Sequence, residues 1–376
     1  MKGLAVLGST GSVGTQTLDV VRSYPDRFRV VALAARTSLA SLESQLREFS
    51  PKLVSCDGTA EEKAPLLSNG CTESTMEDMV RDPDVDLVVS ATVGDAALGP
   101  TLAAIEAGKK VAIANKESVV IAGGLLTDLA KKHNVELLPI DSEPNAIWQC
   151  LQGEHQKIRR LIITASGGAF RDTPPSALVS VTPEQALNHP TWNMGPKITI
   201  DSATLVNKAF EVIEAHWLFG VPWKDIEVVI HPQSMIHSMV EFVDGSVKAH
   251  ISPPDMRVPI QYALFHPERV RNDQVARFDP VATSELTFKP WDPELYPCFG
   301  LVLDVAKRGG TWPAVLCGAD EAAVELFLSK RIGFLEIESV IRSITERHEP
   351  ITNPTAREML SAAAWAKKRA MAGADG

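Results

Sequence analysis

The sequence has no long apolar run and few cysteines, and each shortage narrows what the protein can be. No apolar run approaches the roughly 18–20 residues that cross a bilayer, so we expect no membrane span. Only five cysteines occur, scattered at Cys56, Cys71, Cys150, Cys298 and Cys317 without any Cys-x-x-Cys pair, which indicates reduced thiols in a cytoplasmic protein. An apolar stretch follows almost directly after Met1, so no signal or transit peptide is expected.

Positive charge is also in short supply. Lys and Arg total 37 against 47 Asp and Glu, which gives a net charge of −10. Because nucleic-acid binding needs a concentrated basic surface, no nucleic-acid partner is expected. Any anionic ligand must instead be held by a local pocket.

What is present is an ordinary globular composition in a chain too long for one core. Hydrophobic residues make up 45% and charged residues 22% of the 376 residues. Single cores stop growing near about 250–300 residues, so we expect two or three domains.

Apolar runs alternate with helical patterns over the first third of the chain, which predicts an α/β fold with an N-terminal Rossmann-like, doubly wound parallel sheet. Strands are expected at 3–8, 28–34, 52–56, 87–91, 110–114 and 136–140, with helices at 13–23, 98–107 and 124–133. A central α+β domain is predicted next, with strands at 160–165, 197–201, 226–231, 239–242 and 247–251 and a helix at 208–219. A helical C-terminal domain is predicted from helices at 298–308, 319–329, 334–348 and 353–372. The predicted division is therefore 1–140, 141–265, a proline-rich linker over 266–294, and 295–376.

The first strand leads directly into Gly8-Ser9-Thr10-Gly11-Ser12-Val13-Gly14 and then a helix. Glycines at this spacing let backbone approach a pyrophosphate, and the amides of Thr10, Gly11, Ser12 and Val13 can face the phosphates with the helix dipole behind them. A glycine turn that serves only helix–strand packing is the structural alternative.

The second strand ends in Arg36-Thr37-Ser38, where an NAD site would carry an acidic residue for the ribose 2′-hydroxyl. A guanidinium beside two hydroxyls suits a 2′-phosphate, so NADP is favoured over NAD. The alternative is that Arg36 is an ordinary solvated surface arginine, which would give the same sequence pattern.

Asp141 and Glu143 flank Ser142 in what we expect to be an extended segment, which would direct both carboxylates to one side. Oxygen ligands of this kind suit Mg²⁺ or Mn²⁺, and Glu211 or Glu214 could supply a third carboxylate. A solvated acidic turn is the alternative. Separately, Ser166-Gly167-Gly168, Asp201-Ser202-Ala203-Thr204 and Asn207-Lys208 combine hydroxyls, an amide, an ammonium and a helix N-terminus, a set that favours a phosphate.

Seven motifs follow one another in a fixed order along the chain. They are Gly8–Gly14, Ala114–Ser118, Asp141–Glu143, Ser166–Gly168, His189-Pro190-x-Trp192, Asp201–Glu211 and His231–His237. In these motifs the chain closely resembles the 1-deoxy-D-xylulose 5-phosphate reductoisomerases, essentially from end to end.

The resemblance implies an NADPH-dependent rearrangement and reduction of 1-deoxy-D-xylulose 5-phosphate to 2-C-methyl-D-erythritol 4-phosphate, in the non-mevalonate route to isoprenoid precursors, by a homodimer. It implies that Asp141, Glu143 and Glu211 bind the metal, with Lys116, Glu143, His189 and Glu211 catalytic. The implied substrate contacts are Lys116, Ser142, Glu143, Ser166, His189, Trp192, Ser202, Asn207, Lys208 and Glu211. The implied NADPH contacts are Thr10, Gly11, Ser12, Val13, Arg36, Thr37, Ser38, Asn115, Glu117, Gly195 and Met256. A mobile flap is implied over about 186–197.

Some matching positions keep two interpretations. His237 could be structural or catalytic, His231 is expected to be structural, and Met256 could lie against the nicotinamide or in the core. Pro144 and Pro196 depart from the family pattern, as does Arg36-Thr37-Ser38, which leaves open the individual contacts to the 2′-phosphate. Two other functions fit parts of the pattern: a metal-dependent NADP-linked dehydrogenase of hydroxy acids, which would need an arginine-rich carboxylate pocket, and a catalytically silent NADPH-binding regulator, which would not need the three acids.

Overall fold

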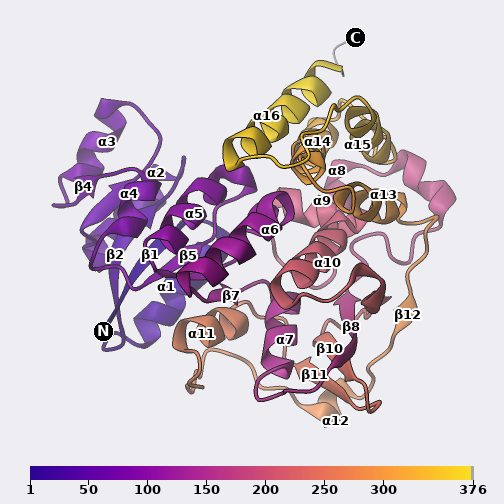
Figure 1. Cartoon of the computed structure of the whole chain (residues 1–376), viewed down its shortest axis with the longest axis horizontal. Coiled ribbons are helices and arrows are strands. Elements are labelled where there is room, and N and C mark those ends of the chain that lie inside the picture. The colour runs from indigo at the N-terminus through magenta and orange to yellow at the C-terminus, as the bar shows by residue number, and fades with distance from the viewer. Residues whose placement is uncertain (374–376) are drawn as a thin grey trace. The chain divides into compact units, whose positions relative to one another are not determined.

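The computed structural model describes residues 1–373 as two compact units that interleave along the chain (Figure 1). The N-terminal unit consists of Met1–Ser118, Gly124–Asn145 and Asp255–Ala276. The C-terminal unit consists of Val119–Gly123, Ala146–Pro254 and the chain from Arg277 onward. The last three residues of the predicted helical domain, 374–376, lie outside the described residues.

A seven-stranded parallel sheet forms the centre of the N-terminal unit, in the order β4-β3-β2-β1-β5-β6-β7. Its strands are β1 (Lys2–Leu7), β2 (Phe28–Ala34), β3 (Leu53–Ser55), β4 (Thr72–Glu73), β5 (Leu87–Ser90), β6 (Lys110–Ile113) and β7 (Leu137–Pro139). Its helices are α1 (Ser12–Ser23), α2 (Leu39–Phe49), α3 (Ala60–Leu67), α4 (Met76–Arg81), α5 (Leu98–Glu106), α6 (Lys116–His133) and α11 (Arg257–Phe265). The predicted doubly wound parallel sheet is confirmed.

The strand order changes direction at β1, because β2 and β5 lie on its two sides. Strands β1, β2 and β5 are almost wholly buried, as expected for a parallel sheet covered on both faces. In open α/β sheets, ligands bind outside the carboxyl ends of the strands at such a point. A nucleotide would therefore be expected to bind at the loops that follow β1, β2, β5 and β6.

Helix α11 belongs to the N-terminal unit although more than one hundred residues separate it from β7. It packs against α1, and the Phe265 ring makes edge contacts with Tyr24 and Phe28 at 4.8 Å between centroids. The ammonium of Lys2 donates to the Leu264 carbonyl at 3.1 Å. The first compact unit is thus completed by a segment that we expected in the central domain.

The C-terminal unit contains a five-stranded mixed sheet in the order β11-β10-β8-β9-β12. Its strands are β8 (Ile158–Ala165), β9 (Ile226–Ile230), β10 (Ile236–Phe242), β11 (Val247–Ile251) and β12 (Lys289–Pro290). Strand β8 pairs in parallel with β9, while β10 is antiparallel to both β8 and β11. The sheet thus combines parallel and antiparallel pairs, in line with the α+β organisation expected for the central region.

Helices make up most of the rest of the C-terminal unit. They are α7 (Ser142–Cys150), which begins in the N-terminal unit, α8 (Pro183–Ala186), α9 (Pro196–Thr204), α10 (Val206–Phe219), α12 (Pro280–Thr283), α13 (Pro297–Ala306), α14 (Trp312–Leu328), α15 (Glu336–Glu346) and α16 (Ala356–Gly373). Helices α14 and α16 pack closely because small buried residues, including Ala319, Ala322 and Ala366, line their contact. The four expected C-terminal helices are confirmed.

Two local predictions are wrong. The strand expected at 197–201 is part of helix α9, because Pro196 occupies a first-turn position that favours helix and the buried Thr199, Ile200 and Ala203 pack on its inner side. The segment around Asp141 and Glu143 is not extended, since Ser142 and Glu143 form the first turn of α7. Within the expected linker, 266–294, β12 pairs with β9, so part of this segment belongs to the sheet.

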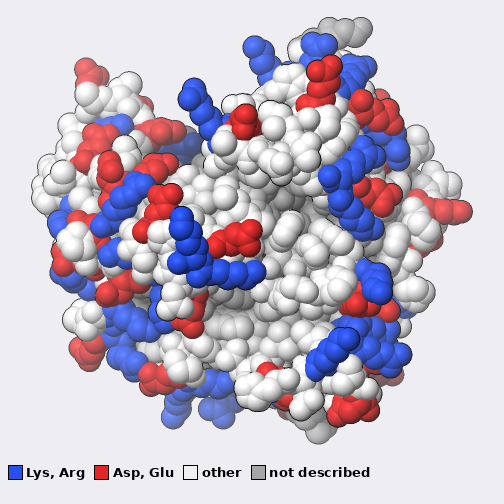
Figure 2. Space-filling view, viewed as in Figure 1, with Lys and Arg blue, Asp and Glu red and all other residues white. Residues whose placement is uncertain are grey.

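No helix within residues 1–373 is both long enough and apolar enough to cross a membrane. On the face drawn in Figure 2, acidic and basic side chains are interspersed rather than gathered by sign.

Candidate active site

The glycine-rich turn after β1 forms a close-fitting cradle at the carboxyl edge of the parallel sheet. Gly8 has a φ of +81°, and a Cβ there would lie 2.4 Å from the Ala91 carbonyl oxygen. A Cβ on Gly14 would lie 2.2 Å from the Gly8 carbonyl oxygen, so both positions exclude any side chain. Helix α1 begins at Ser12 after Gly11, without a side-chain cap and without an acidic residue in its first turn. Its first amides are thus available to an anion, and this geometry fits a pyrophosphate.

The loop after β2 lies next to this cradle because β2 pairs with β1 along its whole length. Arg36, Thr37 and Ser38 follow the strand directly and are all exposed. An exposed guanidinium with two hydroxyls at this edge fits a 2′-phosphate, and the loop itself contains no acidic residue.

The loop after β5 lies against the glycine-rich turn and was not singled out from the sequence. The side-chain amide of Asn115 donates to the carbonyls of Thr92 and Gly94 at 2.8 Å, and its oxygen caps α6 by accepting from the Ser118 N–H at 2.9 Å. Asn115 is 1% exposed, so its side chain shapes this loop from within. The Thr92 hydroxyl is buried and has no hydrogen-bond partner within residues 1–373. The signal available in the sequence was the position of Thr92 just after a buried strand at the change of strand order.

Lys116 and Asp141 are brought together at the neighbouring strand ends. Lys116 is the first residue of α6 after β6, and Asp141 follows β7. The ammonium donates to the Asp141 carboxylate at 2.6 Å, with both side chains largely buried. Ser142 donates to the Glu143 carboxylate at 2.6 Å. Two of the residues expected at the substrate's carbon chain, Lys116 and Ser142, therefore each contact an expected metal ligand.

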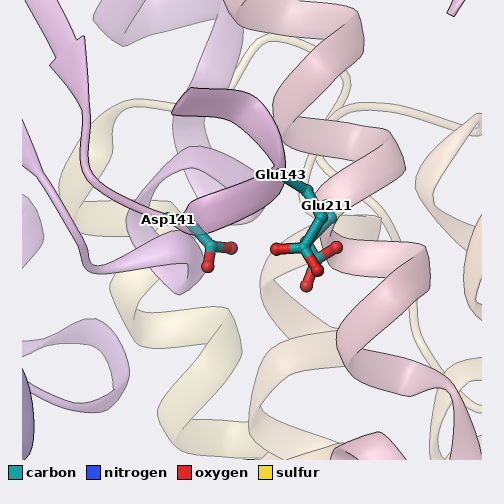
Figure 3. Close-up of side chains that lie close together, drawn as sticks. All are labelled: Asp141, Glu143 and Glu211. Atoms are coloured by element: carbon teal, nitrogen blue, oxygen red, sulfur yellow. The ribbon is translucent and has the colours of Figure 1, made fainter. Parts of the chain in front are cut away.

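Three carboxylates converge on one point in Figure 3. Asp141, Glu143 and Glu211 each place an oxygen within 4.8 Å of the other two. The α7 turn brings Glu143 beside Asp141, so the acids meet although the segment is helical rather than extended. Three hard oxygen donors at this spacing fit Mg²⁺ or Mn²⁺ better than zinc. The geometry selects Glu211 from the two glutamates that the sequence left open for this position.

Helix α10 holds the cationic and amide groups that surround Glu211. Asn207 donates to one Glu211 oxygen at 2.6 Å, and the ammonium of Lys208 forms an ion pair with the other. Lys208 and Glu211 are almost wholly buried. Burying a carboxylate demands such partners, because an uncompensated buried charge is strongly unfavourable.

A second cluster in the C-terminal unit consists of Ser166, His189 and Ser202. The His189 Nε2 lies 2.9 Å from the Ser166 hydroxyl and 3.2 Å from that of Ser202. Its Nδ1 accepts the backbone N–H groups of Thr191 and Trp192 at 3.1 and 2.9 Å, so the proton of the neutral ring is on Nε2. Burial, followed by the positive charges of Arg171 and Lys208, lowers the pKa of His189 to about 4. His189 is therefore a neutral N–H donor at pH 7.

The Ser-Gly-Gly turn is pressed against α9 in a way that only glycine permits. Gly168 has a φ of +67°, and a Cβ there would lie 2.6 Å from the Ser202 carbonyl oxygen and 2.7 Å from the Ala203 Cα. Arg171, which sequence reasoning missed, donates to the Ser166 carbonyl at 3.1 Å. The turn thus brings two hydroxyls and an imidazole N–H together, a group that fits a phosphate.

The expected flap is the loop between α8 and α9. The half-buried Trp192 ring lies 6.2 Å from the His237 ring, and Gly195 is the exposed residue that precedes α9. His237 in turn lies 3.0 Å from the Ser252 hydroxyl. His231 is wholly buried and bonded to the Thr287 carbonyl at 2.8 Å, which agrees with its expected structural role.

The two remaining cofactor positions lie in the N-terminal unit. Glu117 is in the first turn of α6, where its carboxylate accepts from the Asn115 side chain at 3.1 Å. Met256 is half-buried and directly precedes α11. Their roles at the nicotinamide stay predictions.

Comparison with known proteins covers nearly the whole chain. Family models described as 1-deoxy-D-xylulose 5-phosphate reductoisomerase, its C-terminal domain, and DXP reductoisomerase C-terminal domain match residues 4–123, 137–219 and 251–369. The reductoisomerase of Thermomicrobium roseum is 50% identical over 97% of this chain and 96% of its own length, and one from Bacillus cereus is 48% identical over 99% of both.

Solved structures give the same relationship. The Zymomonas mobilis enzyme in complex with NADPH has 38% identity and a TM-score of 0.90, covering 100% of this chain and 99% of its own. A reductoisomerase in complex with NADPH, fosmidomycin and magnesium has 36% identity and a TM-score of 0.91, covering 100% and 98%. With the glycine cradle, the three carboxylates and the serine–histidine pocket all present, the chain belongs to the 1-deoxy-D-xylulose 5-phosphate reductoisomerase family.

Proposed function

We propose that this protein rearranges 1-deoxy-D-xylulose 5-phosphate and reduces the product with NADPH to 2-C-methyl-D-erythritol 4-phosphate, a step in isoprenoid precursor synthesis. The convergence of Asp141, Glu143 and Glu211 carries the proposal. A catalytically silent NADPH-binding protein would have no need of three carboxylates held together. A hydroxy-acid dehydrogenase would bind its substrate through arginines, whereas the anion pocket here is built of serines, an imidazole and a lysine.

The phosphate of the substrate is held by Ser166, His189, Ser202, Asn207 and Lys208. Neutral donors and one ammonium surround it, so the phosphate is bound by charge-assisted hydrogen bonds. The phosphate is remote from the reacting carbons. Binding it orients those carbons and contributes binding energy from contacts outside the reacting centre.

The reacting carbons lie beside Lys116, Ser142 and Glu143. Lys116 holds its ammonium at Asp141, so it can neutralise charge that develops on a substrate oxygen and return to the carboxylate afterwards. Trp192 on the 186–197 flap covers the substrate and excludes water. A metal held by the three acids would polarise the carbonyl and neighbouring hydroxyl, and NADPH on the glycine cradle would supply hydride.

The test follows NADPH absorbance with the full chain and 1-deoxy-D-xylulose 5-phosphate. Oxidation is expected only when Mg²⁺ or Mn²⁺ is present, and chelation with EDTA should stop it. Glu211→Gln should lower turnover at least a thousandfold, because it removes one charged ligand and weakens the stabilisation of developing charge, worth several kcal/mol.

Glu227→Gln is the matched control, since Glu227 is a half-exposed acid on β9 that pairs with Arg160. It should retain wild-type turnover. Metal-independent oxidation, or full activity of Glu211→Gln, would exclude the proposed function.

We infer further that the protein is a cytoplasmic homodimer. Strand β11 is an edge of the five-stranded sheet, and its Val247 and Ile251 are 49% and 39% exposed. An exposed edge strand with apolar side chains is a common site of pairing between chains. Recovery of the NADPH-oxidising activity in the membrane or secreted fraction of the source cells would contradict the assignment to the cytoplasm.

A further inference from the structure

One buried ion cluster in the C-terminal unit is used by none of the steps above. The Lys197 ammonium donates at 2.6 Å to Asp201 on its own helix and at 2.6 Å to Asp320 on α14. Asp201 is 3% and Asp320 0% exposed at the side chain. The same ammonium lies 5.1 Å from the centre of the Phe210 ring on α10. A single side chain therefore links α9, α10 and α14.

Both acids of the cluster are buried. Two carboxylates share one ammonium, and the Asp320 Oδ1 has no hydrogen-bond partner in the described part of the chain. Burial raises the pKa of Asp320, which Lys197 opposes. Burying these charged groups costs desolvation free energy, and apolar side chains of similar size would hold the two helices together at least as well. Ion pairs and hydrogen bonds are directional, so these contacts can fix where α9 lies against α14.

The position in question is that of the phosphate pocket. Lys197 lies in the first turn of α9, which begins without a side-chain cap, and Ser202 lies in the last turn of the same helix. Ser202 contacts His189, and its carbonyl oxygen would lie only 2.6 Å from a Cβ on Gly168. A small displacement of α9 would therefore disturb both hydroxyls of the pocket.

A second polar contact reaches the pocket from the C-terminal helices. The buried Tyr296, just before α13, donates its hydroxyl to the Gly167 carbonyl at 2.8 Å. Gly167 lies between the residues that form the serine turn. Two segments of the C-terminal helical region thus contact the two halves of the pocket, at α9 and at the turn.

We propose that Asp320, acting through Lys197, and Tyr296, acting through Gly167, are positioning residues that set the phosphate pocket from the C-terminal helices. The proposal rests on the proposed function for the identity of the phosphate ester. The pocket geometry itself can be tested with inorganic phosphate, which requires no turnover.

The experiment compares Asp320→Asn, Lys197→Met, their double variant and Tyr296→Phe in the full chain. Titration calorimetry with inorganic phosphate should show dissociation constants raised about fivefold or more in each single variant. The Asp320→Asn and Lys197→Met effects should not add in the double variant, because both break one link. In the NADPH assay, KM for the sugar phosphate should rise while kcat at saturation and the Mn²⁺ affinity change less than threefold.

Glu241→Gln provides the matched control. Glu241 is also a buried acid with two cationic partners, Arg159 and Arg160, but it pairs with β8 six residues before Ser166, about 20 Å away at 3.3 Å per residue. It should lower the melting temperature and leave phosphate affinity unchanged. Equal losses of phosphate affinity in Glu241→Gln and Asp320→Asn, or additive effects in the double variant, would overturn the proposal. If Asp320→Asn does not fold, unchanged phosphate affinity in both Tyr296→Phe and Lys197→Met would by itself overturn the proposal. Absence of turnover in the wild type with normal phosphate binding would contradict only the reaction.

Discussion

At the scale of single residues, the histidine of the flap shows how environment decides chemistry. A histidine has an ordinary pKa near 6.5, at which it would be partly charged in the cell. His189 is instead held neutral by burial and by Arg171 and Lys208, while two backbone amides fix which nitrogen carries the proton. In the proposed phosphate pocket it would therefore act as a directed hydrogen-bond donor rather than as a second cation.

This predicts a pH dependence with a definite sign. The folded-state pKa of His189, about 4, lies below that of the unfolded chain, so the unfolded state takes up a proton first on acidification. Its contribution to stability is thus present in full above pH 6.5 and is lost as the pH falls towards 4.

Urea unfolding of the wild type and of His189→Asn at pH 7.5, 5.5 and 4.5 measures this. The difference in unfolding free energy between the two proteins should become less favourable to the wild type at each lower pH. A constant difference would show that His189 has an ordinary pKa in the folded protein.

The clustering of the three candidate metal ligands could be predicted from the sequence, but the local conformation around them could not. Asp141, Glu143 and Glu211 were named from residue type and motif order, and these acids do meet. Thr92, Arg171 and Tyr296 were missed because their contributions depend on hydrogen bonds to backbone carbonyls that pattern and spacing do not specify.

At the scale of elements, helix α9 marks the limit of propensity. Its sequence, with Ile198, Thr199 and Ile200 in succession, is typical of a strand, and burial against the neighbouring helices overrides that preference. Helix α2 was not foreseen either. The helices at the C-terminus were predicted within a few residues because their apolar spacing extends over several turns, except that α14 begins seven residues before its expected start at 319.

The glycine cradle yields a prediction at this scale. Gly14→Ala should lower the melting temperature and weaken NADPH binding at least tenfold, because the added methyl would lie 2.2 Å from the Gly8 carbonyl oxygen and must displace the turn. Gly300→Ala is the control: it is the same change within α13, where a Cβ meets nothing within 4 Å.

The control should be as stable as the wild type or more stable, since alanine loses less backbone entropy in a helix. Fluorescence titration with NADPH and differential scanning calorimetry would check both variants. If Gly14→Ala bound NADPH normally, the turn would not be the pyrophosphate site.

At the scale of the whole molecule, the fold class follows from length, composition and alternating patterns, whereas the path of the chain through its two compact units does not. Nothing in the sequence of α11 distinguishes a helix of the central domain from one that packs on α1. The predicted boundaries at 140 and 265 remain a prediction of functional domains, and the compact units are interleaved across them.

The proposed dimer can be tested at this scale. Light scattering after size exclusion should give about twice the chain mass of 40.7 kDa. Ile251→Lys, at the edge strand, should shift the protein towards the monomer, because a charge on a sheet edge opposes pairing.

Val281→Lys is the control, since Val281 is 85% exposed on α12 and carries the same change of charge. It should leave the mass at that of the dimer. A dimer of unchanged stability in Ile251→Lys would show that β11 is not the interface.

The return of the chain to α11 has a consequence for synthesis. A nascent chain that has emerged only as far as residue 150 carries every strand of the seven-stranded sheet but lacks α11, so Tyr24 and Phe28 have no Phe265 ring to pack against. The N-terminal unit therefore cannot complete its fold until α11 has emerged from the ribosome. By then more than half of the C-terminal unit has also been synthesised. A gene fragment cut at the apparent end of the Rossmann-like region would be expected to aggregate, and one that fuses Asp255–Ala276 behind a short connector is the fragment to express.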